Sequence, residues 1–138
     1  MESIAKGAME GGNHAALWHG RFEEGPDAQA VEFETSIYVD KDFRHFGIGK
    51  LLLERLEELL QKQNILNVNA CIAFTEQENE YLTNDSFKFH KKMGYTLVGT
   101  FHKCGYKFDK WFDMIWMEKI IGKHIQNQPE VLNFNYGL

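Results

Sequence analysis

The feature that most constrains the fold is a β-type run followed by a short turn with two glycines and then a long amphipathic helix. The run covers residues 31–39, the turn covers residues 44–50, and the helix continues to about Gln63. The first N–H groups of a helix have no intrahelical acceptor and carry a partial positive charge. Gly47 and Gly49 have no side chain that would keep a bulky anion away from this backbone. The segment therefore predicts a pyrophosphate site of the kind used by nucleotide cofactors.

Two other phosphate-binding turns fit this segment less well. A dinucleotide-binding turn needs Gly-x-Gly-x-x-Gly, and here Gly47-Ile48-Gly49 is followed by Lys50-Leu51-Leu52. A Walker loop needs Gly-Lys-Ser/Thr, and here Gly49-Lys50 is followed by Leu51. The alternative to a pyrophosphate site is an ordinary strand-to-helix turn that binds no ligand, with a solvated Arg44.

Composition limits the classes of partner. The net charge of −5 argues against nucleic acid, which needs a basic footprint, although a local positive field is enough for an anionic cofactor. The sequence has no run of about 18 apolar residues, so no membrane span is expected. Its start lacks the apolar core of a signal peptide, and its two cysteines form no Cys-x-x-Cys pair, which predicts a cytoplasmic location. Its histidines show no ligand spacing, so no metal is expected.

The order of predicted elements gives an α+β (α/β layered) class, with a mixed sheet flanked by helices. With 138 residues, one domain is expected over residues 14–121, after a loose leader at 1–13 and before a C-terminal tail at 122–138. The predicted order is strand, strand, helix, strand, helix, strand, strand. The elements are Ala15 to Phe22, Val31 to Val39, Gly47 to Gln63, Val68 to Phe74, Asn84 or Asp85 to Gly94, Tyr95 to Phe101 and a strand through Trp111 to Met117, with a turn at Lys103 to Tyr106.

The turn before the long helix resembles the GNAT superfamily of acetyl-CoA-dependent N-acetyltransferases. It fits the family motif Arg/Gln-x-x-Gly-x-Gly/Ala as Arg44-His45-Phe46-Gly47-Ile48-Gly49. Residues 84–95 look like the second cofactor-side helix of the family, which commonly ends in Gly-Phe or Gly-Tyr. The stretches 34–39 and 105–113, together with His90, are similar to the phosphinothricin and methionine sulfoximine acetyltransferase branch. The resemblance covers about residues 31–118.

The resemblance implies a splay between two central parallel strands, Val31–Val39 and Val68–Phe74, in which the acyl-pantetheine lies. Family members usually carry a strand, two helices and another strand before the stretch that matches Ala15, and here about 14 residues precede it. The N-terminal elements are therefore expected to be truncated, or the acceptor pocket to be completed by a partner subunit. A homodimer is the corresponding prediction.

Cofactor contacts are predicted on two segments. Gly47 to Lys50 would bind the pyrophosphate through backbone N–H groups, with Arg44 and Lys50 adding positive charge. By resemblance, the strand before the turn would offer backbone groups to the pantetheine and the thioester carbonyl. The predicted coenzyme A contacts are Ile37, Tyr38, Val39, Arg44, His45, Phe46, Gly47, Ile48, Gly49, Lys50, Asn84 and Ser86.

Two residues are the predicted catalytic groups. Glu34 would act as the base, through a water. A carboxylate in the middle of a strand is costly to bury unless it has a hydrogen-bond or charge partner, so its presence there indicates a role. The alternative for Glu34 is a solvated or ion-paired side chain. His90 falls where many GNAT enzymes place a Tyr that faces the leaving thiol, and histidine can relay a proton near neutral pH. The alternative for His90 is a histidine at the edge of the core.

The leading interpretation is an acetyl-CoA-dependent N-acetyltransferase that acts on the primary amine of a small molecule, such as an amino acid or the analogues methionine sulfoximine and phosphinothricin. Transfer would be direct, within a ternary complex. One alternative is an acyl-CoA-binding module with weak or no catalysis because its acceptor pocket is incomplete. Another is an interaction domain that has lost both activities.

Overall fold

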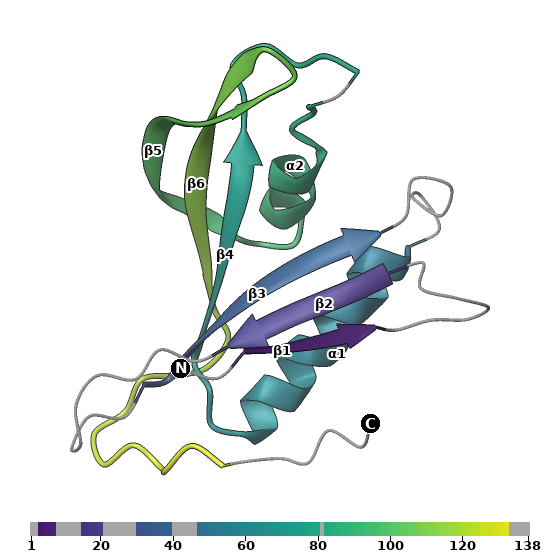
Figure 1. Cartoon of the computed structure of the whole chain (residues 1–138). Helices are drawn as coiled ribbons and strands as arrows, with labels where there is room; N and C mark the ends of the chain where they lie inside the picture. Colours follow the sequence, from purple (N-terminus) through teal and green to yellow (C-terminus); the bar gives the residue numbers. More distant parts are fainter. Residues whose placement is uncertain (1–2, 8–14, 21–29, 40–46, 81, 133–138) are drawn as a thin grey trace. The chain divides into compact units, whose positions relative to one another are not determined.

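The fold was analysed in a computed structural model, which describes residues 3–7, 15–20, 30–39, 47–80 and 82–132. Along the described chain the strands follow the order β1-β2-β3-β4-β6-β5 in hydrogen-bonded pairing (Figure 1). The chain divides into two compact units, one formed by residues 1–68 and 120–138 and the other by residues 69–119.

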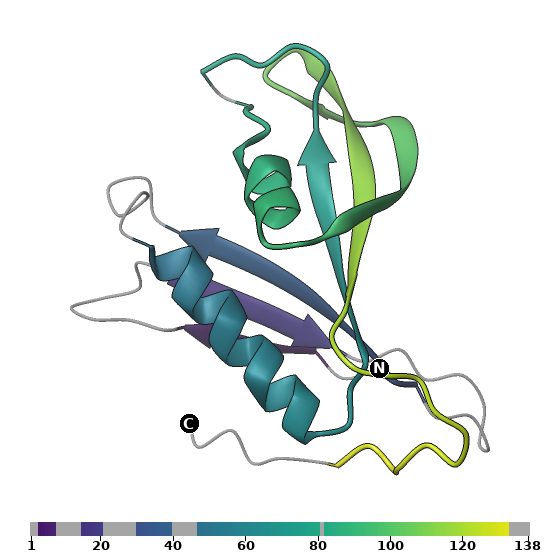
Figure 2. The same ribbon diagram turned by 180° about the vertical axis from the view of Figure 1, so that it is seen from behind.

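The first unit contains an antiparallel sheet of β1 (Ser3–Gly7), β2 (Ala15–Gly20) and β3 (Glu32–Val39). Helix α1 (Ile48–Lys62) lies across one face of these strands, which Figure 2 shows from the helix side. The helix contacts both β2 and β3. Its leucines form the predicted apolar stripe, and Leu53 and Leu60 are fully buried. The stripe, and not helix propensity alone, holds the helix in place.

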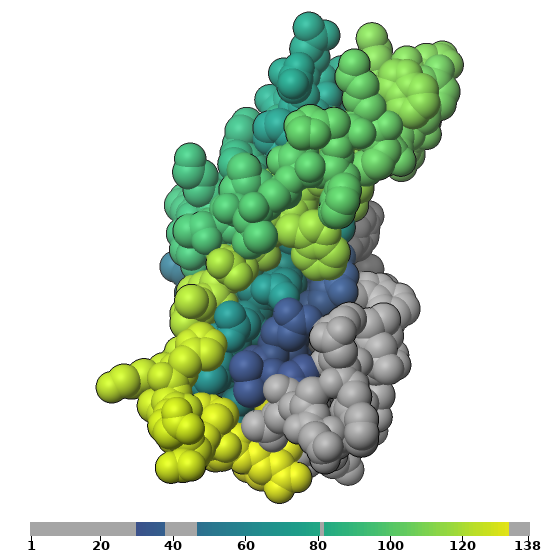
Figure 3. Space-filling model, turned by 90° about the vertical axis from the view of Figure 1, so that its left-hand side faces the viewer, coloured from purple at the N-terminus to yellow at the C-terminus, as the bar shows by residue number. Residues whose placement is uncertain are grey.

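The C-terminal end of α1 is closed by a distant part of the chain. The helix ends at Lys62, and Asn64 adopts a left-handed backbone with φ 66°, as the predicted stop at Asn64 requires. Three side-chain amides then bind the segment that follows β6: Gln61 Nε2 donates to Ile121 O, Gln63 Nε2 to Leu132 O, and Asn64 Nδ2 to Glu130 O, all at 2.8–2.9 Å. Figure 3 shows this segment in yellow. The predicted tail is therefore tied down as far as Leu132.

The second unit contains most of β4 (Asn67–Phe74), helix α2 (Asp85–Lys92), β5 (Thr96–Lys107) and β6 (Lys110–Ile120). Strand β6 lies between β4 and β5 and pairs with β5 in antiparallel fashion. Helix α2 packs on this sheet through Phe87, whose ring meets Phe74 edge-on at 5.3 Å. Its end at Gly94, predicted from the sequence, has φ 95°, a value that suits glycine.

The turn predicted at Lys103–Tyr106 is wrong. Strand β5 continues through it to Lys107, and the reversal occurs at Phe108 and Asp109, which have φ values of 50° and 60°. The pairing shifts between Phe101↔Met114 and Gly105↔Phe112, so β5 advances four residues while β6 advances two. The extra residues form an irregularity in the strand, with Lys103 at φ 48°. The predicted turn corresponds to this irregularity, because Gly105 within it is a residue type typical of turns.

Within the predicted leader, residues 3–7 form β1, a strand that the sequence did not predict, and pair with β2 from Ser3↔Gly20 to Gly7↔Ala16. A short edge strand is held by its backbone hydrogen bonds and needs little side-chain alternation, which is why the sequence pattern did not reveal it. The predicted α+β class is confirmed by the strands and the two helices that pack on them. The predicted domain boundaries and the splay between the central strands stay predictions.

The hairpin supplies a test of packing at Gly105. A Cβ at this position would overlap the ring of Phe112, whereas a Cβ at Gly99 in the same strand would meet nothing within 4 Å. We expect Gly105→Ala to lower the free energy of unfolding by about 1–3 kcal/mol, because the ring must leave its place over the glycine. The measurement is urea denaturation, with Gly99→Ala as the control. Equal stability of the two variants would contradict this packing.

Candidate functional site

The start of helix α1 leaves its backbone donors open. Gly47 is the N-cap residue, with φ 77° and ψ 9°, and no side chain of the described residues caps the helix. The first intrahelical bond runs from Leu51 N to Gly47 O at 3.0 Å, so the preceding N–H groups have no acceptor within the helix. The first turn contains no acidic residue, and a Cβ on Gly47 would meet nothing within 4 Å. This is the geometry that favours a bound anion.

The side chains of this turn are only partly described. Arg44, His45 and Phe46 lie outside the described residues. Ile48 and Gly49 are half-buried, while the Lys50 side chain is 64% exposed, with its Nζ 3.8 Å from Glu54 Oε1. An exposed pair of this kind contributes little to stability, so Lys50 can turn toward an anion at small cost.

Strand β3 shows the predicted two faces. Phe33 and Thr35 are buried, with exposed fractions of 4% and 2%, whereas Glu34 and Ser36 are exposed. Glu34 thus lies on the open face of the strand and not in the core. Ile37 is half-buried and pairs with Leu17 of β2.

The end of β3 is described for its backbone alone. Tyr38 and Val39 continue the register opposite Ala16 and Ala15 of β2, while their side chains lie outside the described residues. Because the predicted pantetheine contacts are made by backbone groups, these residues keep the extended geometry that such contacts need. The contacts themselves stay a prediction.

His90 is held rigidly inside the second unit. Its side chain is 2% exposed, and its ring meets Tyr95 edge-on at 5.1 Å. Its Nδ1 lies 2.8 Å from Ser86 O and 3.5 Å from Ser86 Oγ. Because a carbonyl oxygen can only accept, the Nδ1 atom that faces Ser86 O carries a proton. The two predicted residues Ser86 and His90 are therefore brought together by one turn of α2.

Asn84, predicted as a cofactor contact, has a clear structural role. Its Oδ1 accepts from Thr75 N at 3.0 Å and its Nδ2 donates to Thr75 O at 2.7 Å. Its own N–H donates to Glu78 Oε1 at 2.7 Å. The amide closes the loop that joins β4 to α2, and its contact with the cofactor stays a prediction.

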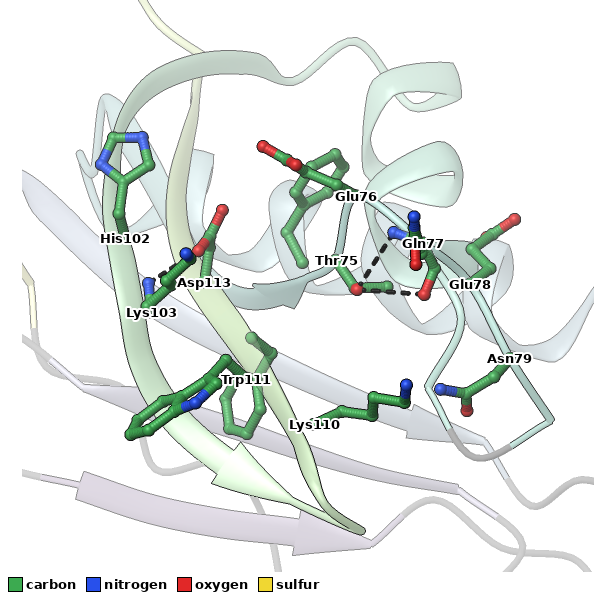
Figure 4. Close-up of a pocket in the computed structure, with 12 residues that line it drawn as sticks. Thr75, Glu76, Gln77, Glu78, Asn79, His102, Lys103, Lys110, Trp111 and Asp113 are labelled. Atoms are coloured by element: carbon green, nitrogen blue, oxygen red, sulfur yellow. Dashed lines mark hydrogen bonds between the residues drawn. The ribbon is translucent and has the colours of Figure 1, made fainter.

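A pocket in the second unit was missed by sequence reasoning (Figure 4). Its volume is about 340 Å³, and its walls are the loop after β4 and the adjoining parts of β5 and β6. The sequence predicts a polar, acidic loop at residues 75–82, but it contains no signal that places this loop against the hairpin. The lining residues are Phe74, Thr75, Glu76, Gln77, Glu78, Asn79, His102, Lys103, Lys110, Trp111, Phe112 and Asp113.

One carboxylate of this pocket is already engaged. The backbone N–H of Asn84 and the ammonium of Lys88, 3.3 Å away, hold the pKa of Glu78 below its usual value. Glu78 therefore favours its ionised form, in which it accepts the hydrogen bonds from Asn84 N and Lys88 Nζ that hold the loop in place.

The described residues contain neither a metal-binding cluster nor a membrane-spanning helix. No cluster of three or more His, Cys, Asp or Glu side chains suited to a metal ion occurs among residues 3–7, 15–20, 30–39, 47–80 and 82–132. In that same part of the chain, neither helix combines the length and apolar character that a bilayer span requires.

Sequence comparison identifies a matching family model and named relatives. The model of the acetyltransferase (GNAT) domain matches residues 9–116. A phosphinothricin N-acetyltransferase of Streptomyces coelicolor is 34% identical over 92 residues, which cover 67% of this chain and 50% of that protein. An L-methionine sulfoximine/L-methionine sulfone acetyltransferase of Pseudomonas aeruginosa is 31% identical over 85 residues, 62% of this chain and 45% of that protein. The chain thus spans about half the length of these relatives.

Solved structures agree with this match. An N-acetyltransferase of Staphylococcus aureus Mu50 has a TM-score of 0.65 and 31% identity, over 83% of this chain and 65% of that one. A phosphinothricin acetyltransferase of Sinorhizobium meliloti in complex with AcCoA has a TM-score of 0.68 and 21% identity, over 98% of this chain and 68% of that one, and supports the fold alone. The resemblance predicted from the sequence is confirmed.

The open helix start leads to a binding prediction. We expect Gly47→Val to raise the Kd for coenzyme A at least about tenfold, because a branched side chain blocks the approach to the backbone donors. Gly94→Val is the matched control, since Gly94 also has a positive φ, of 95°, but lies at the end of α2. Calorimetric titration of both folded variants is the measurement. Equal affinity in the two variants would exclude the helix start as the anion site.

Proposed function

The chain belongs to the GNAT acetyltransferase family, and we propose that it transfers the acetyl group of acetyl-CoA to the primary amine of a small amino acid or analogue. The observation that carries the proposal is the uncapped start of α1 at Gly47, free of acidic residues and open to a bulky anion. The names of the two relatives above give phosphinothricin and methionine sulfoximine as their substrates. Amino-acid analogues are therefore the first acceptors to test.

Direct transfer needs a neutral amine and a polarised thioester. In the proposed reaction the amine nitrogen forms a bond to the thioester carbonyl carbon, and the carbon–sulfur bond then breaks. Backbone N–H groups of residues 37–39 would stabilise the carbonyl oxygen as it gains charge. Glu34, exposed on the open face of β3, would take the proton of the ammonium through a water.

The leaving thiolate needs a proton. His90 is the proposed donor, because histidine can relay a proton near neutral pH and the Ser86 carbonyl fixes the orientation of its ring. The nitrogen loses two protons, one to Glu34 before the attack and one to solvent as the carbon–sulfur bond breaks, while the thiolate gains one from His90. Coenzyme A leaves as the thiol and the acceptor leaves as the N-acetyl amide. Glu34 then gives its proton to solvent and His90 regains one, so the reaction releases one proton in total.

We also propose that the protein works as a homodimer in the cytoplasm. The support for a dimer is the number of large apolar side chains that remain exposed on the β5–β6 hairpin, whose surface is drawn in green in Figure 3. They are Leu97, Val98, Phe101, Tyr106, Phe108 and Trp111, each more than half exposed. A second copy seated on this hairpin would cover them and supply further walls for the acceptor pocket.

The catalytic role of Glu34 gives a kinetic prediction. We expect Glu34→Gln to lower kcat at least about tenfold, because the amide cannot accept the proton, while the Kd for acetyl-CoA stays nearly unchanged. Thiol release with methionine sulfoximine measures kcat, and Glu32→Gln, one pleat away on the same strand, is the control. Full activity of Glu34→Gln would remove this residue from the mechanism. Binding of acetyl-CoA by the wild type without turnover on any amine would favour an acyl-CoA-binding module.

The proposed dimer predicts a change in assembly. We expect the wild-type chain to sediment as a dimer at micromolar concentration and Phe101→Asp to sediment as a monomer, because a charge would be buried at the interface without a partner. Phe101 is 62% exposed in the single chain. Ile125→Asp, on the segment after β6, is the control and should leave the dimer intact. A wild-type monomer, or dimers for both variants, would contradict the proposal.

A further inference from the structure

We propose that the face of the β5–β6 hairpin that points away from α2 is a self-complementary docking surface, on which Phe101 of one copy fills the space above Gly99 of a second copy. The inference rests on the proposed homodimer, and it assigns to that dimer one face of the hairpin and one repeated contact. All the residues that carry it belong to the second unit.

The strand register decides which residues share this face. Three consecutive pairs join β5 and β6 without interruption: Gly99↔Trp116, Thr100↔Ile115 and Phe101↔Met114. Ile115 is 2% exposed and lines a cavity together with Phe87 of α2, so the middle pair faces the helix. Because side chains alternate between the two faces of a strand, the other two pairs lie on the opposite side of the hairpin. This outer face is defined by Gly99, Phe101, Met114 and Trp116.

The outer face carries a projecting ring and an unfilled space side by side. Phe101 is 62% exposed, whereas Met114 and Trp116 are half-buried. A Cβ at Gly99 would meet nothing within 4 Å, although Trp116 is its ladder partner. None of the four residues is charged, and exposed apolar surface of this kind is typical of a site of protein contact.

The other half of the same strand shows how such a space is filled within one chain. Gly105 pairs with Phe112, and a Cβ at Gly105 would overlap the Phe112 ring. An aromatic ring that covers a strand glycine in this way stabilises the sheet. Trp116 leaves the corresponding space above Gly99 open. A ring from a second molecule would therefore complete at Gly99 the packing that Phe112 completes at Gly105.

A second copy of the chain supplies this ring by symmetry. Phe101 and Gly99 lie one residue to either side of Thr100 on the same strand. A two-fold axis at the level of Thr100, between two facing outer faces, stacks the two β5 strands in opposite directions. Phe101 of each copy then lies over Gly99 of the partner subunit, so the same contact occurs twice, as a two-fold interface requires. Stacked sheets lie about 10 Å apart, a distance that interdigitating side chains fill.

The charges at the ends of the outer face favour the same orientation. Glu118 continues the alternation of Met114 and Trp116 on β6, and Lys107 lies at the opposite end, beside the hairpin turn. Stacking in opposite directions brings the Glu118 end of one copy to the Lys107 end of the other. The reverse orientation would bring like charges together, which is unfavourable at an interface.

The test removes the ring and the space one at a time in the full chain. Gly99→Phe fills the space, so that two rings would meet where one fits, and Phe101→Gly leaves the space empty. We expect each variant alone to raise the dissociation constant of the dimer at least about tenfold, measured by sedimentation equilibrium. A patch that acts through apolar area alone predicts the opposite for Gly99→Phe, because this change adds apolar surface and would tighten the dimer.

Mixing the two variants should restore assembly. The Gly99→Phe chain then supplies both rings and the Phe101→Gly chain supplies both spaces, so an equimolar mixture should form heterodimers with nearly the wild-type dissociation constant. A fluorescent label on the N-terminus of one variant identifies the mixed species during sedimentation. Circular dichroism checks that each variant is folded, and Gly99→Leu with Phe101→Ala should give the same pattern if either of the first pair does not fold.

Two controls make the same kinds of change away from the hairpin, on the segment after β6. Ile125→Gly removes an exposed apolar side chain, and Lys123→Phe adds an exposed ring. Both variants should keep the wild-type dissociation constant. Equal weakening in these controls would show that the effect does not belong to the outer face and would overturn the proposal.

The outcomes separate this inference from the proposed function. A wild-type dimer that persists in Gly99→Phe and Phe101→Gly, or two monomeric variants that do not assemble when mixed, would overturn the outer face and leave the homodimer. A wild-type monomer would overturn both. The measurement uses no acetyl-CoA and no acceptor, so its result is independent of whether the chain transfers an acetyl group.

Discussion

The proposed chemistry depends on backbone donors that the helix α1 leaves unused at Gly47. The chain carries a net charge of −5, so an anionic cofactor cannot be attracted by overall charge. It must be held by a local field, which the aligned peptide dipoles of α1 and its first N–H groups provide. The other helix makes the contrast clear, because α2 has Asp85 in its first turn whereas the first turn of α1 has no acid. Of the two helices in the described part of the chain, α1 is the one whose N-terminus has a glycine at the N-cap and no acidic residue in its first turn.

The pocket of the second unit obtains its charges in another way. There the charged groups are side chains, and several of them already have partners within the fold. Glu78 and Asp113 stabilise the loop and the hairpin by accepting hydrogen bonds from backbone N–H groups, whereas Glu76 and Lys110 make no such bond within the described residues. The Asn84 amide closes the same loop on Thr75. A single loop therefore combines a bonded backbone with the carboxylate of Glu76.

The helices and the central strands were predictable because their signals are local. The leucine stripe gives α1, Asn64 and Gly94 mark the helix ends, and the alternation around Glu34 gives the two faces of β3. The edge strand β1 and the length of β5 were not predictable in this way. Both depend on pairing with another strand, and the real turn places Phe108 in a left-handed conformation that a bulky residue rarely adopts. The pocket was missed for the same reason, since Glu76 and Lys110 are far apart in the sequence and only the fold brings them to one cavity.

The exposure of Glu34 bears on how a base can work on this strand. A buried carboxylate would need a partner to offset the loss of hydration, and such a partner would compete for the proton. Strand alternation avoids this conflict by putting Phe33 and Thr35 into the core and Glu34 on the open face. His90 presents the opposite case, because it is buried and its Nδ1 is bound to the Ser86 carbonyl. In the proposed mechanism an exposed Glu34 would suit a proton transfer that begins in solvent, whereas a His90 held in one orientation would suit a transfer that must reach one sulfur atom.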